Sequence, residues 1–383
     1  MAEAELKGWT EGQGSTAGGV GQAREEAYYV ASQWQLMWWK FIKHKLATIA
    51  GPVLIVLYLS ALLADFISPT LPDTRFTRYK GAPPQAIRFY QEGKGFTAPF
   101  VYELARYSDP QTFKRTFVID KSKTYPVSFF GRGEPYRLLG FIPTDIHLFV
   151  APDAPLFLLG TDKLGRDVFT RILYGSRISL SIGLVGVALT FTLGLLLGGI
   201  SGYMGGIVDT LIQRTIDLIV CIPTIPLWMA LAAAMPRDLP VVQTYLGMVV
   251  IMSVINWVGL ARVVRGKLLS LREEVFCEAA RLAGASDLRI ITRHLLPSFA
   301  SYIIVALTLS IPGTILGETA LSFLGLGLQP PAVSWGVLLQ DAQNLEMIAH
   351  HPWLLTPAAW VVLAVLMFNF LGDGLRDAAD PYK

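Results

Sequence analysis

The sequence predicts an all-α polytopic membrane protein with six transmembrane helices and a small β-rich insertion between the first two. Of its 383 residues, 52% are hydrophobic and only 16% are charged, whereas soluble domains are nearer a quarter charged. Apolar runs long enough to cross a bilayer recur along the chain. The net charge of +3 is too small to indicate nucleic-acid binding. The 2 cysteines, one of them in a predicted membrane helix, indicate no disulfide framework.

The predicted spans are apolar segments with about the 20 residues that a helix needs to cross some 30 Å of hydrocarbon. They cover residues 46–66, 178–201, 215–235, 245–264, 299–324 and 353–371. Prolines in the third and fifth, at Pro223, Pro226 and Pro312, are expected to break or bend those helices.

Lysine and arginine set the predicted orientation. Lys40, Lys43 and Lys45 precede the first span, and a run of arginines follows the fourth, whereas residues 325–352 contain neither residue type. Because basic loops stay inside, we expect both termini and the loop after the fourth span to be cytoplasmic. The predicted location is the inner (cytoplasmic) membrane.

The N-terminal region divides into two parts. Residues 1–33 are polar and glycine-rich, without a cleavable-signal pattern, so we expect a disordered cytoplasmic tail. Residues 34–66 hold "WQLMWWKFIKHK" and the first span. The mixture of tryptophan and lysine fits either a short helix in the headgroup layer or an aromatic belt at the end of the span. Either structure anchors the chain.

Residues 67–165 form the loop between the first two spans, which the span count makes extracytoplasmic. Its runs "TFKRTFVID", "YPVSFF" and "YRLLGFI" are separated by Gly, Pro and Asp, a pattern that predicts short strands. One hypothesis makes this loop the working part of a membrane enzyme or assembly factor. A catalytic constellation would then be needed, and the loop offers only His147 with scattered acids.

Sequence signatures of an energy source or a metal site are missing. The sequence contains no G-x-x-x-x-G-K-[ST] phosphate loop and no H-E-x-x-H. It also lacks the series of intramembrane acids that marks proton-coupled carriers, since Asp217 and Glu318 stand nearly alone. We therefore assign no catalytic or metal-binding residue. The chain is expected to supply a pathway while another subunit supplies the energy; a stand-alone secondary carrier is the weaker alternative.

The stretch "EEVFCEAARLAGASDLRIITRHLLPSF", residues 273–299, separates the fourth and fifth spans. Residues 273–285 favour helix, Gly284 allows a C-terminal turn, and Pro297 suits the return into the membrane. Phe276, Ala279 and Leu282 can share one helical face. From these residues alone, a partner-binding helix and an ordinary basic loop are equally good interpretations.

Within this stretch, "EAARLAGASDLRIITRHLLP" resembles the EAA loop of permease subunits in ABC importers. The positions that match the family pattern are Glu278, Ala279, Ala280, Gly284, Leu296 and Pro297. The general pattern has isoleucine where this chain has His294, and an Arg-His pair there is usual in the peptide-transporter branch. Residues 158–180, 317–339 and 369–381 resemble the C-type permease of dipeptide and oligopeptide transporters. The resemblance covers residues 156–383 closely and the first span loosely.

The resemblance implies a type I ABC importer permease fold, with a permease core at residues 166–383 and a cytoplasmic coupling loop at 265–297. It also implies a non-catalytic subunit that binds no cofactor itself. ATP and Mg would be used by two ATP-binding partner subunits. A second permease, an extracytoplasmic solute-binding protein and membrane lipid complete the implied partners, without nucleic acid. Glu278, Ala280 and Gly284 are the expected docking surface for the ATPase.

The predicted pathway runs along the second to fifth spans, with Pro223, Asn256, Pro312 and Glu318 as candidate residues. Glu318 is expected either at an aqueous vestibule or paired with the partner permease. The charged residues of 162–177 favour an ion-paired helix, and contact with the binding protein is the alternative. Peptides are the expected cargo, with oligosaccharides, opines or nickel as alternatives, because residues 70–155 form a longer loop than a plain dipeptide permease needs.

Overall fold

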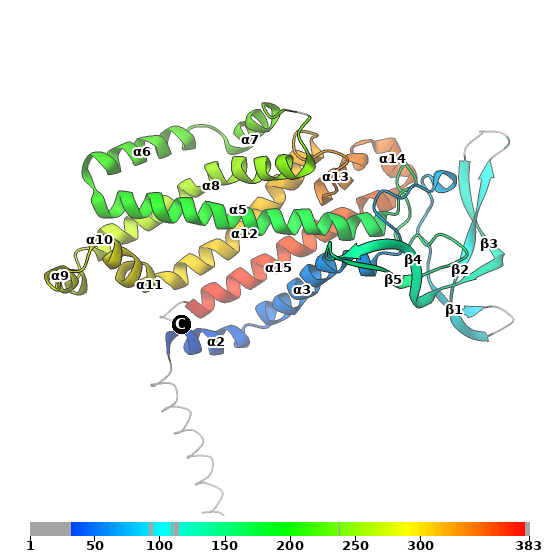
Figure 1. Cartoon of the computed structure of the whole chain (residues 1–383), viewed down its shortest axis with the longest axis horizontal. Helices are drawn as coiled ribbons and strands as arrows, with labels where there is room; N and C mark the ends of the chain where they lie inside the picture. The colour runs from blue at the N-terminus through cyan, green and yellow to red at the C-terminus, as the bar shows by residue number, and fades with distance from the viewer. Residues whose placement is uncertain (1–31, 92–94, 109, 111–114, 237, 380–383) are drawn as a thin grey trace, which may run out of the picture.

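A computed structural model describes residues 32–91, 95–108, 110, 115–236 and 238–379. Figure 1 shows long helices lying side by side, with the strands at one end of them and α9 at the other. The expected disordered tail, residues 1–33, lies almost entirely outside the described residues. Its last two residues already belong to the capped start of a helix, because the Ser32 side chain accepts a bond from the Gln35 amide.

Five helices within the described part of the chain are long and apolar enough to cross a membrane. They confirm the first, second, fourth, fifth and sixth predicted spans: α3 (Lys45–Leu62), α5 (Val168–Met204), α8 (Val241–Leu271), α12 (Ala300–Phe323) and α15 (Thr356–Ala379). The helix α5 has 37 residues, or roughly 55 Å at 1.5 Å per residue. It therefore extends well beyond the hydrocarbon layer.

The third predicted span is not one straight helix. It consists of α6 (Gly206–Val220) and α7 (Thr224–Ala233), which meet at an angle of 88°. Pro223 caps the start of α7 in an extended conformation and Pro226 lies in its first turn, so the backbone bonds that would continue α6 are not made. The structure therefore has six crossings in its described part only if α6 and α7 together are taken as one crossing.

The helices α5 and α8 pack closely because glycine recurs along one face of α5. Gly194, Gly198 and Gly202 lie against α8, where a Cβ on Gly198 would come within 2.6 Å of the Ala261 carbonyl oxygen. This small-xxx-small spacing lets two backbones approach in a membrane. Ion pairs fasten α6 to α8 near one end: Arg265 binds Asp209 through two bonds of 2.6 Å.

The remaining bundle packs around a buried cluster to which α3, α5, α12 and α15 contribute. Ile172, Ile315, Trp335 and Phe368 belong to it. The short helix α2 (Gln33–Lys43) precedes α3 and contacts α15, and it exposes Trp38 and Trp39. The other short helices are α4 (Ala64–Ile67), η1 (Thr77–Tyr79), α9 (Val275–Leu282), α10 (Asp287–Arg289), η2 (Ile290–Leu295), α11 (Leu296–Ser298), α13 (Trp335–Gln340), η3 (Asp341–Gln343), α14 (Leu345–His350) and η4 (Pro352–Leu355).

The insertion between α4 and α5 is strand-rich, as predicted. One antiparallel sheet has the order β1–β2–β3, from β1 (Arg88–Gln91), β2 (Gly95–Ser108) and β3 (Arg115–Pro126). A second pairs β4 (Ser128–Leu138) with β5 (Ile142–Val150). The run "YRLLGFI" covers the end of β4, the turn and the first residue of β5; the turn lies at Leu139 and Gly140, which have φ of 54° and 84°.

The only histidine of the insertion has a structural position. Both ring nitrogens of buried His147 lie against carbonyl oxygens, of Ser68 at 2.5 Å and of Glu134 at 2.9 Å. Glu134 in turn accepts bonds from the Leu71 amide and the Thr74 hydroxyl. These contacts fasten the β4–β5 pair to the end of the first span.

The predicted ion-paired helix over 162–177 starts later than expected. Residues 160–167 form a turn, here called the junction turn, and α5 begins at Val168 with Asp167 as its N-cap. The ion pairs themselves are present, because Asp162 binds both Arg166 and Arg171. The aspartate accepts bonds from the backbone amides of Leu164 and Arg166 as well, which favours a tight turn over a helix.

Candidate functional site: the α9 segment and the cavities

The connection between α8 and α12, residues 272–299, is here called the α9 segment. Its helix α9 ends in a Schellman turn, in which the Ala285 amide donates to the Ala280 carbonyl at 3.0 Å and the Gly284 amide to the Arg281 carbonyl at 2.9 Å. Gly284 has φ of 78°, a conformation in which any other residue is strained. The glycine predicted from the sequence therefore terminates α9.

One face of α9 is fixed to the helical bundle. Cys277 is fully buried in a cluster with Leu268 of α8 and with Ile290 and Leu295, and Ala280 packs against the same cluster. The Tyr203 hydroxyl at the end of α5 donates to Asp287 at 2.6 Å. These contacts join the α9 segment to the membrane helices α8 and α5.

The opposite face of α9 is open and apolar. Leu282 is 91% exposed and Val275 79% exposed, and Phe276 and Ala279 are also on the surface. This confirms that Phe276, Ala279 and Leu282 share a face. Exposed large apolar side chains gathered on one helix are typical of an interaction site.

The predicted docking residues divide between these two faces. Glu278, Ala279, Gly284 and Pro297 are exposed. Ala280 packs against the cluster that includes Cys277 and is only partly exposed, and Leu296 is half-buried there too. The helical period of 3.6 residues explains the difference, since Ala280 lies three positions from Cys277.

A central cavity of about 370 Å³ lies between α5, α7, α8 and α12. Its polar lining consists of Thr190, Trp228, Asn256, Tyr302, Ser310 and Thr314. The indole N–H of Trp228 is buried, and no residue in the described part of the chain accepts a hydrogen bond from it. The cavity thus offers donors and acceptors within an apolar wall, a combination typical of solute sites. Sequence reasoning identified Asn256 but missed Trp228 and Tyr302, since no motif distinguishes them from packing aromatics.

The other three predicted pathway residues lie elsewhere. Pro223 is exposed at the start of α7, and Pro312 is buried inside α12. Glu318 does not line the central cavity: it is fully buried and accepts bonds from the hydroxyls of Ser179, Ser322 and Ser334 at 3.3, 2.8 and 2.7 Å. The expected vestibule position is wrong, because serines from α5, α12 and the segment before α13 already satisfy this carboxylate.

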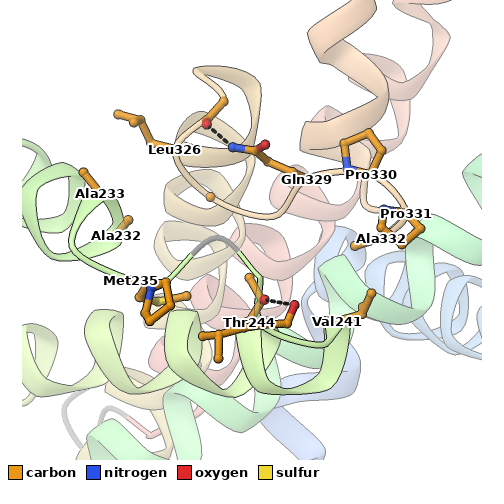
Figure 2. A pocket seen from close by; sticks show the side chains of 14 residues that line it. Ala232, Ala233, Met235, Val241, Thr244, Leu326, Gln329, Pro330, Pro331 and Ala332 are labelled. Atoms are coloured by element: carbon orange, nitrogen blue, oxygen red, sulfur yellow. Dashed lines mark hydrogen bonds between the residues drawn. The ribbon is translucent and has the colours of Figure 1, made fainter.

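A second cavity, of about 180 Å³, lies between the α7–α8 connection and the segment after α12. Figure 2 shows Met235, Val241 and Thr244 on one side of it, with Gln329 and Pro330 on the other. The Gln329 amide donates to the Gly325 carbonyl at 2.5 Å. This outer cavity lies at the same end of the helices as the strands (Figure 1).

Metal-ligating clusters were also sought. No group of three or more His, Cys, Asp or Glu residues that could hold a metal ion occurs among the residues that the structure describes.

Two family matches decide the family. Residues 194–382 match the family described as binding-protein-dependent transport system inner membrane component, and residues 32–84 match the N-terminal transmembrane domain of oligopeptide transport permease C. The chain belongs to this permease family. The matched part contains the α9 segment and three of the four helices that surround the central cavity, α7, α8 and α12, whereas residues 85–193 lie between the two matches.

Characterised relatives agree with the family. The chain is 41% identical to the dipeptide transport system permease protein DppC of Bacillus subtilis over 58% of this chain and 68% of that one. It is 42% identical to the oligopeptide transport system permease protein OppC of Haemophilus influenzae, over 58% and 69%. A putative peptide permease of Brucella suis is 39% identical over 67% and 81%.

A solved structure of the MetNI methionine ABC transporter, in an inward-facing conformation, matches with 19% identity and a TM-score of 0.43. The match covers 55% of this chain and 97% of the other.

Proposed function

We propose that the chain is the permease subunit of an ATP-driven, binding-protein-dependent importer of peptides in the inner membrane. The observation that supports the transport role most directly is α9, a rigidly held helix whose free face is apolar. The peptide cargo is supported by the relatives, at 39–42% identity, whose names refer to dipeptides, oligopeptides or peptides. Oligosaccharides, opines and nickel are not favoured by these names.

In this proposal the exposed face of α9 docks on an ATP-binding subunit. Leu282, Phe276 and Ala279 supply the apolar contact, with Glu278 and Gly284 at its border. ATP and Mg are used by that partner, and this chain is not itself an enzyme. A second permease, two ATP-binding subunits and an extracytoplasmic binding protein complete the assembly.

Movement of α9 then changes the central cavity. The helix α8 leads into the α9 segment and α12 leads out of it, and the cavity is lined by Asn256 of α8 and Ser310 of α12. Because Cys277 and Ala280 are packed against α8, α9 moves with the bundle and not independently of it. Closure of the ATPase dimer is therefore converted into opening of the cavity toward one side or the other.

The proposal also assigns sides. The start of α3 and the end of α15 lie together, since a Cβ on Gly374 would meet the side chains of Ala47 and His44. Figure 1 shows these ends, like α9, away from the strands. We assign this end to the cytoplasm because of its basic residues, and residues 67–165 to the outer side.

The test uses two exposed leucines at opposite ends of the molecule. The L282D variant should assemble poorly with the ATPase, with docking weakened by more than about 30-fold if Leu282 is a hot spot of about 2 kcal/mol. Peptide import into proteoliposomes should fall in parallel. The matched control is L345D, because Leu345 is 82% exposed on α14 and should leave ATPase assembly unchanged. Unchanged import in L282D contradicts the docking role.

The cargo is tested separately from the docking. The proposal requires a solute-binding protein, expected from a neighbouring gene; this protein is purified, and the small molecules released from it are identified by mass spectrometry. Bound peptides would support the proposed cargo. A bound sugar, opine or nickel ion would contradict the peptide assignment but would leave the proposed permease role unchanged.

A further inference from the structure

A third cavity, of about 350 Å³, lies where the junction turn meets the segment that joins α12 to α13. We call it the arginine cavity because four of its lining residues are basic: Arg75, Lys163, Arg166 and Arg171. Pro330 and Pro331 line both this cavity and the outer cavity of Figure 2. Its place is therefore beside the outer mouth of the helical bundle.

Two of these arginines converge on one carboxylate oxygen. Arg166 Nε is 2.7 Å and Arg171 Nη1 is 2.6 Å from the same Oδ2 atom of Asp162. The side chains of Asp162, Arg166 and Arg171 are only 3%, 9% and 3% exposed. The other oxygen of Asp162 already accepts two backbone amides, so this carboxylate has no capacity left for further donors.

The nearby acids do not balance the second arginine. Asp341 binds Lys163 at 2.6 Å, and Asp73, the other acid in the lining, is exposed. Buried Asp167 accepts a bond from the Thr170 amide as the N-cap of α5. With Asp162 included, the four basic side chains of the lining face three acids, which leaves one positive charge in excess at the cavity; Asp167 lies outside the lining.

An unused donor accompanies this excess charge. The Nε atom of Arg171 is buried and has no hydrogen-bond partner among the described residues, and Arg171 lines the cavity. A guanidinium has five donors in a planar fork that matches a carboxylate. The cavity thus combines an excess of basic side chains, a buried donor that no described residue accepts from, and room for a small group.

We propose that the arginine cavity binds the C-terminal carboxylate of a peptide at the outer mouth, before the peptide reaches the central cavity. This inference rests on the proposed peptide cargo. The proposed path of the peptide then leads from the arginine cavity past Pro330 and Pro331 to the outer cavity, whose lining includes Ala232 of α7. Trp228, one turn earlier on α7, lines the central cavity. Arg166 and Arg171 are then specificity-determining residues for the free acid terminus.

The experiment measures binding to the assembled permease and ATPase complex in nanodiscs, without the binding protein. The probes are trialanine and its C-terminal amide, compared by isothermal titration calorimetry at low salt. The wild-type complex should bind the acid about tenfold more tightly, which corresponds to about 1.4 kcal/mol, because a charge-assisted hydrogen bond is lost in the amide. Equal binding of the two probes overturns the inference.

The variants R166Q and R75Q should each reduce this preference for the acid. R166Q is expected to fold, because Arg171 and Asp162 remain as a neutral pair, and Arg75 is exposed. The matched control is R132Q, since the Arg132 side chain is 85% exposed on β4, outside the cavity. Loss of the preference in R166Q and R75Q but not in R132Q supports the site. A preference that survives both variants, or that falls equally in R132Q, overturns it.

A second assay separates this inference from the proposed function. Import of trialanine into proteoliposomes is measured with the binding protein and ATP. If the wild-type complex imports no trialanine, the proposal that peptides are the cargo is contradicted, whatever the calorimetry shows. Import without any acid preference in binding removes only the arginine site. An R166Q complex that keeps the preference but loses affinity for the binding protein assigns the arginines to protein docking and likewise overturns the proposal.

Discussion

The junction turn and the α9 segment look alike in the sequence but differ in the structure. Each is a polar, glycine-containing stretch next to apolar helices. In the junction turn, Asp162 binds Arg166, and it also binds Arg171 in the first turn of α5. All three side chains are buried. In the α9 segment, Glu278 and Leu282 face outward. The first region buries its charged groups against one another within the chain, whereas the second leaves an apolar face exposed.

The glycines of the two regions show the same contrast. Gly165 and Gly284 have nearly equal φ values, 80° and 78°. A Cβ on Gly165 would collide with the carbonyl oxygen of Phe76, whereas nothing lies within 4 Å of the corresponding position on Gly284. Similar backbone conformations therefore serve close packing in one region and a free end in the other.

The largest expected effect that tests this comparison is on stability at the junction turn. D162A leaves two buried guanidinium groups without a carboxylate and should destabilise the protein by about 3–5 kcal/mol. Size-exclusion chromatography of a fluorescent fusion, followed by thermal unfolding, measures this loss. D162N keeps hydrogen-bond acceptance without the charge and should lie between D162A and the wild type. A wild-type unfolding temperature in D162A would show that the junction turn does not depend on its ion pairs.

The next largest effect compares the two glycines directly. G165A and G284A both force alanine into the left-handed region, at about 1–2 kcal/mol. G165A adds a collision with the Phe76 carbonyl, which should cost about 1–3 kcal/mol more. Thermal unfolding of the two variants side by side measures the difference. Equal destabilisation would mean that the backbone near Phe76 moves aside without cost.

A smaller effect is expected at the N-cap of α5. D167A removes the acceptor for the Thr170 amide and should cost about 1 kcal/mol, whereas D167N retains a capping oxygen and should cost less. Chemical or thermal unfolding of both variants measures this order. The same stability in D167A and D167N would assign the residue no capping role.

The same aspartate predicts a pH dependence. Burial raises the pKa of the Asp167 carboxyl, which precedes α5, to about 6 from a model-compound value of 3.8. The folded protein therefore binds the Asp167 proton more tightly than the unfolded chain does. The stability that this proton contributes is greatest below pH 4 and is lost as the pH rises to about 6. Unfolding temperatures at pH 4.5 and 7 should differ less in D167N than in the wild type. An identical pH profile in D167N would contradict this assignment.

The smallest effect on stability is expected at α9. E278A changes an exposed residue and should alter stability by less than about 0.5 kcal/mol. If α9 docks on the ATPase, peptide import should nevertheless fall severalfold in the same variant. Thermal unfolding and import into proteoliposomes, measured on one preparation, separate the two effects. A large loss of stability would show that Glu278 belongs to the fold and not to the contact surface.

Much of the fold follows from local sequence. Five of the predicted spans are single helices, and the Glu-Ala-Ala helix ends at the predicted glycine. Local signals also explain the errors. Hydropathy by itself gives residues 215–235 as one straight span, whereas Pro223 and Pro226, where a break or bend was expected, correctly mark its division between α6 and α7. The run "YRLLGFI" has strand-forming residues, but Leu139 and Gly140 place the turn there.

The candidate site was less predictable, because long-range contacts decide it. No sequence rule brings Ser179 and Ser334 to Glu318 across α5 and α12, so the exposure of Glu318 was predicted wrongly. Likewise, the inward position of Ala280 depends on how α9 is seated against Leu268 and Ile290. Motif matching selects the segment and not the face that each residue presents.

The sequence by itself determined that the chain crosses a membrane several times, and that the helix α9 ends at Gly284. The length of an apolar run and the residues that end a helix are local properties of the sequence, so they act independently of how the helices pack against one another. Only the tertiary structure decided which charges are buried together and which remain free. Burial of Asp162 with two arginines requires three chain segments to close around them, and the free energy of a charge depends on what surrounds it.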